Sequence, residues 1–111
     1  MYNRFSNVFD SSWWCNMLKI TDDILINRVG IYDTYIKGKQ YYNSGRVREV
    51  RSNSDYDYFT GSVHGSSVYT TTVNFNDYGN IASTSCSCQA FKNFSGDCKH
   101  IVALLMKIRQ Y

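Results

Sequence analysis

Three of the four cysteines and one of the two histidines in this 111-residue chain lie within one fifteen-residue stretch. They are Cys86, Cys88, Cys98 and His100, in the order C-x-C-x9-C-x-H. Three thiols and one imidazole are the number and type of ligands that one tetrahedral Cys3His zinc site requires. The motif constrains the fold strongly, because the two segments that carry the ligands must lie next to each other in space.

The spacing of the four residues also predicts their local structure. Residues two apart in a strand point to the same side, so a strand over 81–88 can direct Cys86 and Cys88 to one point. Residues two apart in a helix do not face each other, so Cys98 and His100 can converge only where a helix begins. The positive end of that helix would favour the thiolate and the neutral imidazole that a metal binds.

The residues around Cys98 predict where this helix begins. Ser95-Gly96-Asp97 is typical of a turn, with Asp97 as the candidate N-cap. A helix over 98–108 then has an apolar face suited to a core, formed by Ile101, Leu104, Leu105 and Ile108.

The motif resembles the SWIM zinc finger, whose signature is C-x-C, a variable loop, and C-x-H at the start of a helix. The segment GKQYYNSGRV, from Gly38 to Val47, is similar to the G-x-x-Y-Y-x-x-G-x-V stretch that precedes the finger in bacterial SWIM proteins. The resemblance covers about residues 38 to 106. It implies a zinc-binding module for DNA or protein interaction, as found beside helicase-like ATPases and in transposases.

The residues before the motif predict helices followed by strands. Phe9, Trp13 and Met17 are spaced four apart, which predicts a short helix from about Ser11. Thr21 is a candidate N-cap for a helix, or a pair of helices broken near Gly30, over 22–43. From residue 46 the apolar period changes to two, which predicts strands over 46–51, 56–64, 67–75 and 81–88. In the first of these strands, Val47 and Val50 would lie on opposite faces, so it requires a bulge or burial on both sides.

These elements predict one α+β domain over residues 1–111. Its parts are a helical N-terminal region (1–45), an antiparallel meander of about four strands (46–88), and the zinc finger with a C-terminal helix (86–110). That helix and the last strand together carry the Cys3His site.

The cysteine content and the distribution of apolar residues indicate the cellular compartment of the protein. No segment has the features of a signal peptide, and no run approaches the ~20 apolar residues of a membrane span. We therefore expect a cytoplasmic protein with no membrane partner. Four cysteines could instead form two disulfides, but in a reducing compartment this spacing favours a metal. Cys15 has no ligand partner at metal spacing.

The candidate catalytic groups argue against an enzyme. Four protein ligands leave no open position for water, which catalytic zinc retains. The zinc-deaminase signature requires a glutamate two residues after its histidine, where this chain has Val102. A Cys–His nucleophile pair, Cys98 with His100 or Cys15 with His64, is the enzymatic alternative, but no orienting motif accompanies either. We expect no catalysis and no small-molecule substrate.

The formal net charge is only +3, so any binding of nucleic acid must come from local basic patches. Around the finger and its helix the candidates are Lys92, Lys99, Lys107 and Arg109, and Arg46 and Arg48 lie on the first strand. Either set could contact phosphates, although a solvated basic face is the equal alternative. We expect DNA or a protein as the partner. The other hypothesis is a regulatory module of a helicase-like ATPase without direct nucleic-acid contact.

Overall fold

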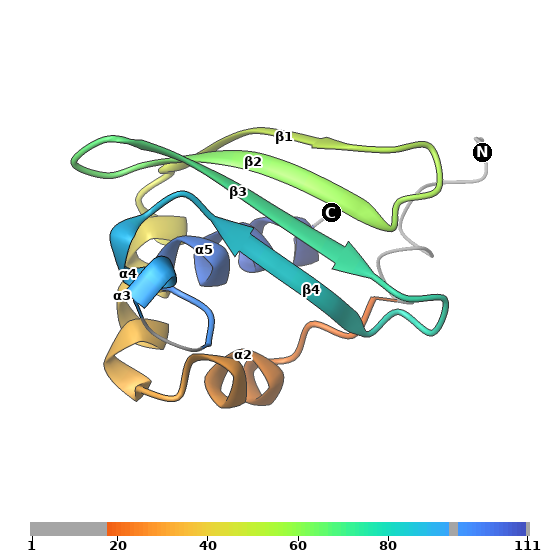
Figure 1. Ribbon diagram of the computed structural model, residues 1–111, viewed down its shortest axis with the longest axis horizontal. Helices are drawn as coiled ribbons and strands as arrows, with labels where there is room; N and C mark the ends of the chain where they lie inside the picture. Colours follow the sequence, from red (N-terminus) through yellow and green to blue (C-terminus); the bar gives the residue numbers. More distant parts are fainter. Residues whose placement is uncertain (1–17, 94–95, 111) are drawn as a thin grey trace.

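The structure is a computed structural model, which describes residues 18–93 and 96–110. The elements follow in the order α2 (Asp22–Val29), α3 (Tyr32–Asn43), β1 (Val47–Ser52), β2 (Tyr58–His64), β3 (Val68–Phe75), β4 (Ile81–Cys86), α4 (Gln89–Asn93) and α5 (Lys99–Arg109). Figure 1 shows their arrangement. The helix predicted from about Ser11 and Cys15 both lie outside the described residues.

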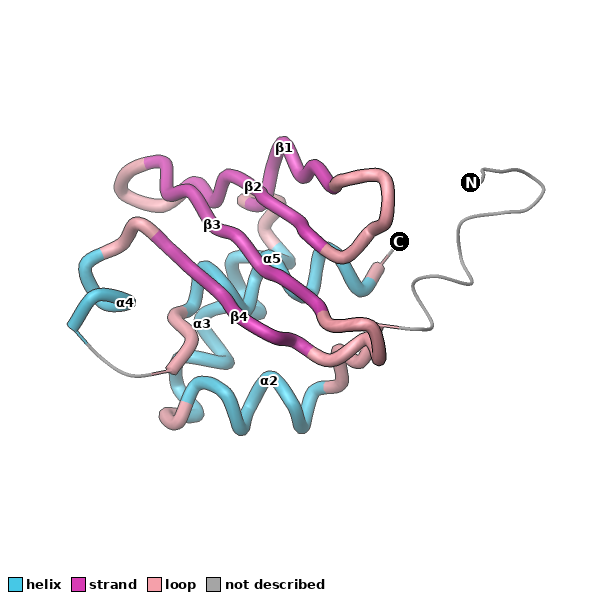
Figure 2. Tube along the Cα trace, turned by 45° about the vertical axis from the view of Figure 1, so that its right-hand side comes forward, coloured by secondary structure: helices cyan, strands magenta, loops and turns pink. Residues whose placement is uncertain are grey.

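The four strands form one antiparallel sheet in the order β1-β2-β3-β4, so each strand pairs with the next in the chain. Helices α2, α3 and α5 lie on the same face of this sheet (Figures 1 and 2). Along β2, the buried residues Phe59, Gly61 and Val63 alternate with more exposed ones, as expected for a strand covered on one face. The predicted α+β fold, with a four-stranded meander and a C-terminal helix, is confirmed.

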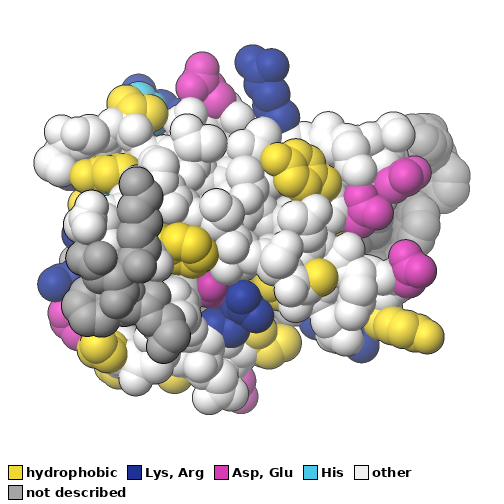
Figure 3. Space-filling model, in the orientation of Figure 1, with side chains coloured by type: hydrophobic (Ala, Val, Ile, Leu, Met, Phe, Trp, Pro, Cys, Tyr) yellow, Lys and Arg dark blue, Asp and Glu magenta, His cyan; other side chains and the backbone are white. Residues whose placement is uncertain are grey.

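The face of the sheet that points away from the helices is polar but carries little charge. Thr60 of β2 pairs with Thr72 of β3, which pairs with Ser85 of β4. On the same face, Arg48 of β1 pairs with Ser62 of β2. In Figure 3, most of the surface over the strands is white, the colour of uncharged polar side chains and backbone.

The edge strand β1 contains a bulge. Its register with β2 shifts between Arg48 and Arg51, and Glu49 has a φ of 56°. One extra residue brings both valines to the helix-covered side, since Val47 is 6% exposed and Val50 packs against the core. Of the two predicted alternatives, a bulge or burial on both sides, β1 has the bulge.

The helical region before the sheet is a pair of helices, which is one of the two predicted alternatives. Thr21 caps α2, because its side-chain oxygen accepts a hydrogen bond from the Ile24 N–H at 3.2 Å. The chain turns at Gly30 and Ile31 and continues as α3.

Helix α5 lies in the core, between the sheet and α3 (Figure 1). The predicted apolar face is fully buried, with Ile101, Leu104, Leu105 and Ile108 at 0% exposure. Val102, Ala103 and Met106 are also buried, because α3 covers the side of α5 that the sheet does not. This close approach requires Gly38 in α3, where a Cβ atom would lie 2.5 Å from the Cβ of Val102.

Among the described residues, no helix has both the length and the apolar character needed to cross a membrane.

Candidate metal centre

The end of β4 and the short helix after it position the first two cysteines. Cys86 is the last residue of β4, and Cys88 follows two residues later, outside the strand that was predicted to include it. Both side chains are buried. Helix α4, which the sequence did not predict, directs the backbone N–H of Phe91 to the Cys88 sulfur at 3.4 Å. A donor of this kind stabilises a thiolate.

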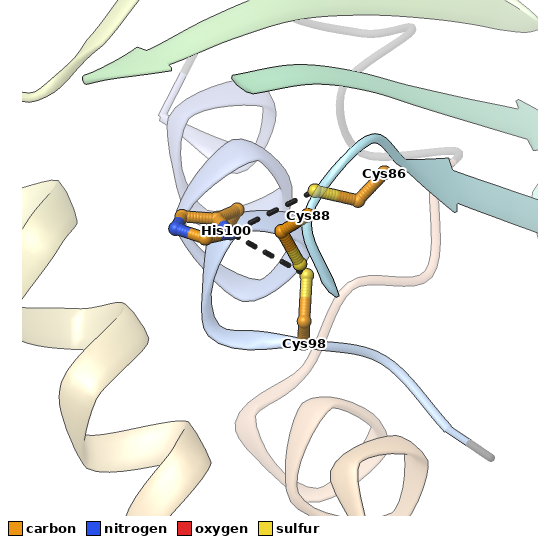
Figure 4. A group of neighbouring side chains, drawn as sticks. All are labelled: Cys86, Cys88, Cys98 and His100. Atoms are coloured by element: carbon orange, nitrogen blue, oxygen red, sulfur yellow. Dashed lines mark hydrogen bonds between the residues drawn. The ribbon is translucent and has the colours of Figure 1, made fainter. Parts of the chain in front are cut away.

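The start of α5 positions the other two side chains. Cys98 is the N-cap, with extended backbone angles, and His100 is in the first turn of the helix. The His100 Nδ1 atom lies 3.7 Å from the Cys86 sulfur and 3.8 Å from the Cys98 sulfur (Figure 4). The helix begins one residue later than predicted, and the prediction of Asp97 as its N-cap is wrong.

These distances fit a tetrahedral zinc ion. Bonds of about 2.3 Å to sulfur and 2.0–2.1 Å to nitrogen would separate a sulfur and a nitrogen ligand by about 3.6 Å. The ligand atoms of Cys86, Cys88, Cys98 and His100 all lie within 4.8 Å of one another, and all four residues are buried. The group could therefore hold one zinc ion, and its atoms already lie close to the positions that a zinc ion requires.

The pKa of the Cys98 thiol shows that a metal ion must displace a tightly held proton in order to bind there. A hydrogen bond with Cys86 and burial raise the pKa of the Cys98 thiol to about 12, while His100 and the Ile101 N–H lower it. Without a metal, the Cys86 thiol and burial therefore oppose the thiolate that the helix start was predicted to favour. A divalent cation held by these groups would supply the charge that stabilises the thiolate, and the thiol proton would be released to solvent.

Comparison with known proteins matches the C-terminal part of the chain to one family. Residues 69–109 match the SWIM zinc finger family. These residues are similar to a SWIM zinc finger, and we call them the SWIM finger. The match includes all of β3 except its first residue, together with β4, α4, α5 and the four clustered side chains. It begins after the similar segment from Gly38 to Val47. No curated protein and no solved structure matches the chain.

Two tyrosines fix the ring of His100 in the SWIM finger. Tyr69 of β3 stacks on the ring, with centroids 4.3 Å apart, and Tyr41 of α3 meets it at an edge, at 5.5 Å. The Nε2 atom is buried and has no hydrogen-bond partner in the described part of the chain. Aromatic packing therefore orients the ring so that Nδ1 faces the sulfurs. No local signal in the sequence pairs either tyrosine with His100.

An ion pair attaches the SWIM finger to α2. The Asp97 carboxylate accepts hydrogen bonds from Arg28 Nε and from the Thr84 hydroxyl, both at 2.6 Å, and its backbone N–H donates to the Arg28 carbonyl. Gly96 has a φ of 96°, and a Cβ atom there would lie 2.7 Å from the same carbonyl. The Asp97 carboxylate therefore bonds to Arg28 of α2 and does not cap α5, the helix that follows it.

The structure separates the six basic residues that were predicted to bind nucleic acid. The side chains of Arg46 and Lys99 come together at the ring of Tyr41, next to the finger. Arg109 lies at the far end of α5 and forms an ion pair with Asp22 at 2.8 Å. The remaining three are Lys107, which is half-buried in the last turn of α5, Arg48, which is exposed on β1, and Lys92, whose side chain lies outside the described part.

Proposed function

We propose that Cys86, Cys88, Cys98 and His100 bind one zinc ion, and that the SWIM finger is a non-catalytic module that binds DNA through its phosphate backbone. The spacing of the four ligand atoms supports the metal assignment. Four protein ligands complete a tetrahedral shell, so no position remains for a reacting water, and a structural role for zinc follows.

The burial of α5 favours contacts with the phosphate backbone of DNA over recognition of its base sequence. Eight of its eleven residues are buried, which leaves few side chains that could reach base edges in a groove. The cations at the ring of Tyr41, Arg46 and Lys99, can instead contact phosphates, whose positions depend little on base sequence. We therefore expect weak binding, with little preference between sequences.

Fluorescence anisotropy with a labelled 20-base-pair duplex, measured over a range of salt concentrations, tests this function. Contacts with two to four phosphates predict a slope of roughly −2 to −4 in a plot of log K against log salt. Duplexes of unrelated sequence should bind with affinities within about threefold of one another, because phosphate contacts carry no sequence information. No binding by the zinc-loaded protein at low salt, or binding that is indifferent to salt, would refute the proposal in favour of a protein partner.

A further inference from the structure

The strongest candidate surface outside the metal group is built around Tyr41, in the last turn of α3. The guanidinium of Arg46 lies 5.1 Å from the centre of the Tyr41 ring, and the ammonium of Lys99 lies 5.2 Å from it. Cation–π attraction at these distances holds both charged groups in place. We call these three residues the Tyr41 platform.

The two cations of the Tyr41 platform have no acidic partner among the described residues. The ion pairs there join Arg28 with Asp97, Lys37 with Asp33, and Arg109 with Asp22. Arg46 also donates a hydrogen bond to the carbonyl oxygen of His64, at 3.1 Å, which fixes its direction without neutralising it. Two positive charges, held on one ring and no more than about 10 Å apart, form a site for anionic groups.

The Tyr41 platform is joined directly to the metal group. Lys99 lies between Cys98 and His100 in the chain, so its backbone position depends on two of the four clustered residues. The ring of Tyr41 also contacts the ring of His100. Any change in how these residues are held will therefore move a cation, and a phosphate bound at the cation will restrain them in turn.

We propose that Arg46 and Lys99, held on the ring of Tyr41, form the main phosphate-binding site for DNA, and that DNA bound there slows the loss of zinc. The inference rests on the proposed function, because it identifies the residues of that same interface. It assigns no such role to Arg109, whose charge is already paired.

Charge reversal at the platform tests its location. The double variant Arg46→Glu/Lys99→Glu is compared with a control, Lys39→Glu/Arg51→Glu, which changes the net charge equally at exposed positions of α3 and β1. The platform variant should bind the labelled duplex at least about 100-fold more weakly, and its salt slope should fall by about 2. The control should lose much less affinity. Zinc content, measured by elemental analysis, should stay at the wild-type level in both.

The outcomes separate this inference from the proposed function. If wild type binds DNA but the two double variants lose affinity equally, the platform is not the site, and the proposed function stands. If the platform variant binds as well as wild type, the inference is also overturned. If wild type itself does not bind, the proposed function and this inference fail together.

The rate of zinc transfer to a chromogenic chelator tests the coupling on the folded, zinc-loaded protein. Saturating duplex should slow the transfer from wild type by at least about fivefold, the lower end of typical coupling between two sites. It should have no such effect on the platform variant at the same DNA concentration. An unchanged rate in wild type, under conditions where anisotropy shows that DNA is bound, would overturn the coupling.

Discussion

His100 has two ring nitrogens in different surroundings, and the difference decides which one can bind a metal. Nδ1 lies within 3.8 Å of two sulfurs, whereas Nε2 is buried away from any hydrogen-bond partner in the described residues. Metal-bound histidines usually direct their second nitrogen to a carboxylate or a carbonyl group. Here the stacked Tyr69 ring provides the orientation instead, so ring packing and metal binding depend on each other.

The ligand assignment predicts that Cys86→Ser removes stoichiometric zinc, whereas Cys15→Ser does not. A serine hydroxyl does not replace a thiolate ligand, and Cys15 has no ligand partner at metal spacing in the sequence. Elemental analysis after extensive dialysis measures the zinc in each variant. About one zinc ion per chain retained by Cys86→Ser, or lost by Cys15→Ser, would contradict the assignment.

The packing of α5 against α3 depends on a residue without a side chain. A Cβ atom at Gly38 would meet the Cβ of Val102 at 2.5 Å and the carbonyl oxygen of Lys99 at 2.9 Å. Neither atom is at the end of a flexible side chain, so neither can swing away. Lys99 and Val102 lie in the first turns of α5, so a displacement here would also disturb the helix end that carries Cys98 and His100.

We predict that Gly38→Ala destabilises the protein by about 1–2 kcal/mol. Overpacking costs about 1–3 kcal/mol, which outweighs the gain of up to about 1 kcal/mol from replacing glycine inside a helix. Lys39→Ala, at the next and exposed position of α3, is the control and should change stability by less than about 0.5 kcal/mol. Urea denaturation of the zinc-loaded proteins measures both. A Gly38→Ala variant as stable as wild type would show that the two helices can separate without cost.

The features that depend only on residues close together in the chain could be predicted from the sequence. Alternating burial in β2 and β3, the cap at Thr21 and the bulge between the valines of β1 all depend on residues close together in the chain. The remaining features depend on distant partners. Asp97 resembles a helix cap locally, but Arg28 lies 69 residues away and takes its carboxylate. Likewise, no periodicity within α5 indicates that α3 would bury its second face, or that α4 would form between the cysteines.

At the scale of the whole molecule, one helix carries both the centre of the core and half of the metal group. Residues of α5 contact the sheet and α3, and its first turn holds His100. The SWIM finger is therefore not an appendage on a separate domain within the described part of the chain. A change in the structure of the finger will therefore also destabilise the packing of the sheet.

We predict that zinc removal unfolds at least the C-terminal third of the chain and lowers the melting temperature of the whole. Structural zinc contributes an apparent ~10–16 kcal/mol in finger peptides at neutral pH, as much as the roughly 5–15 kcal/mol that keeps a domain folded. Circular dichroism before and after chelation measures the change, and added zinc should restore the original transition. An unchanged melting temperature in protein shown to be metal-free would rule out this structural role.

The bulge in β1 also affects how two copies of the molecule can meet. A regular edge strand offers a continuous row of N–H and C=O groups with which a strand of another molecule can pair, and such pairing begins aggregation. In β1 the extra residue at Glu49 interrupts that row, and Arg48 and Arg51 on either side of it are exposed charges. A second copy would bring like charges together along an irregular edge, so this side of the sheet is a poor template for intermolecular β-structure.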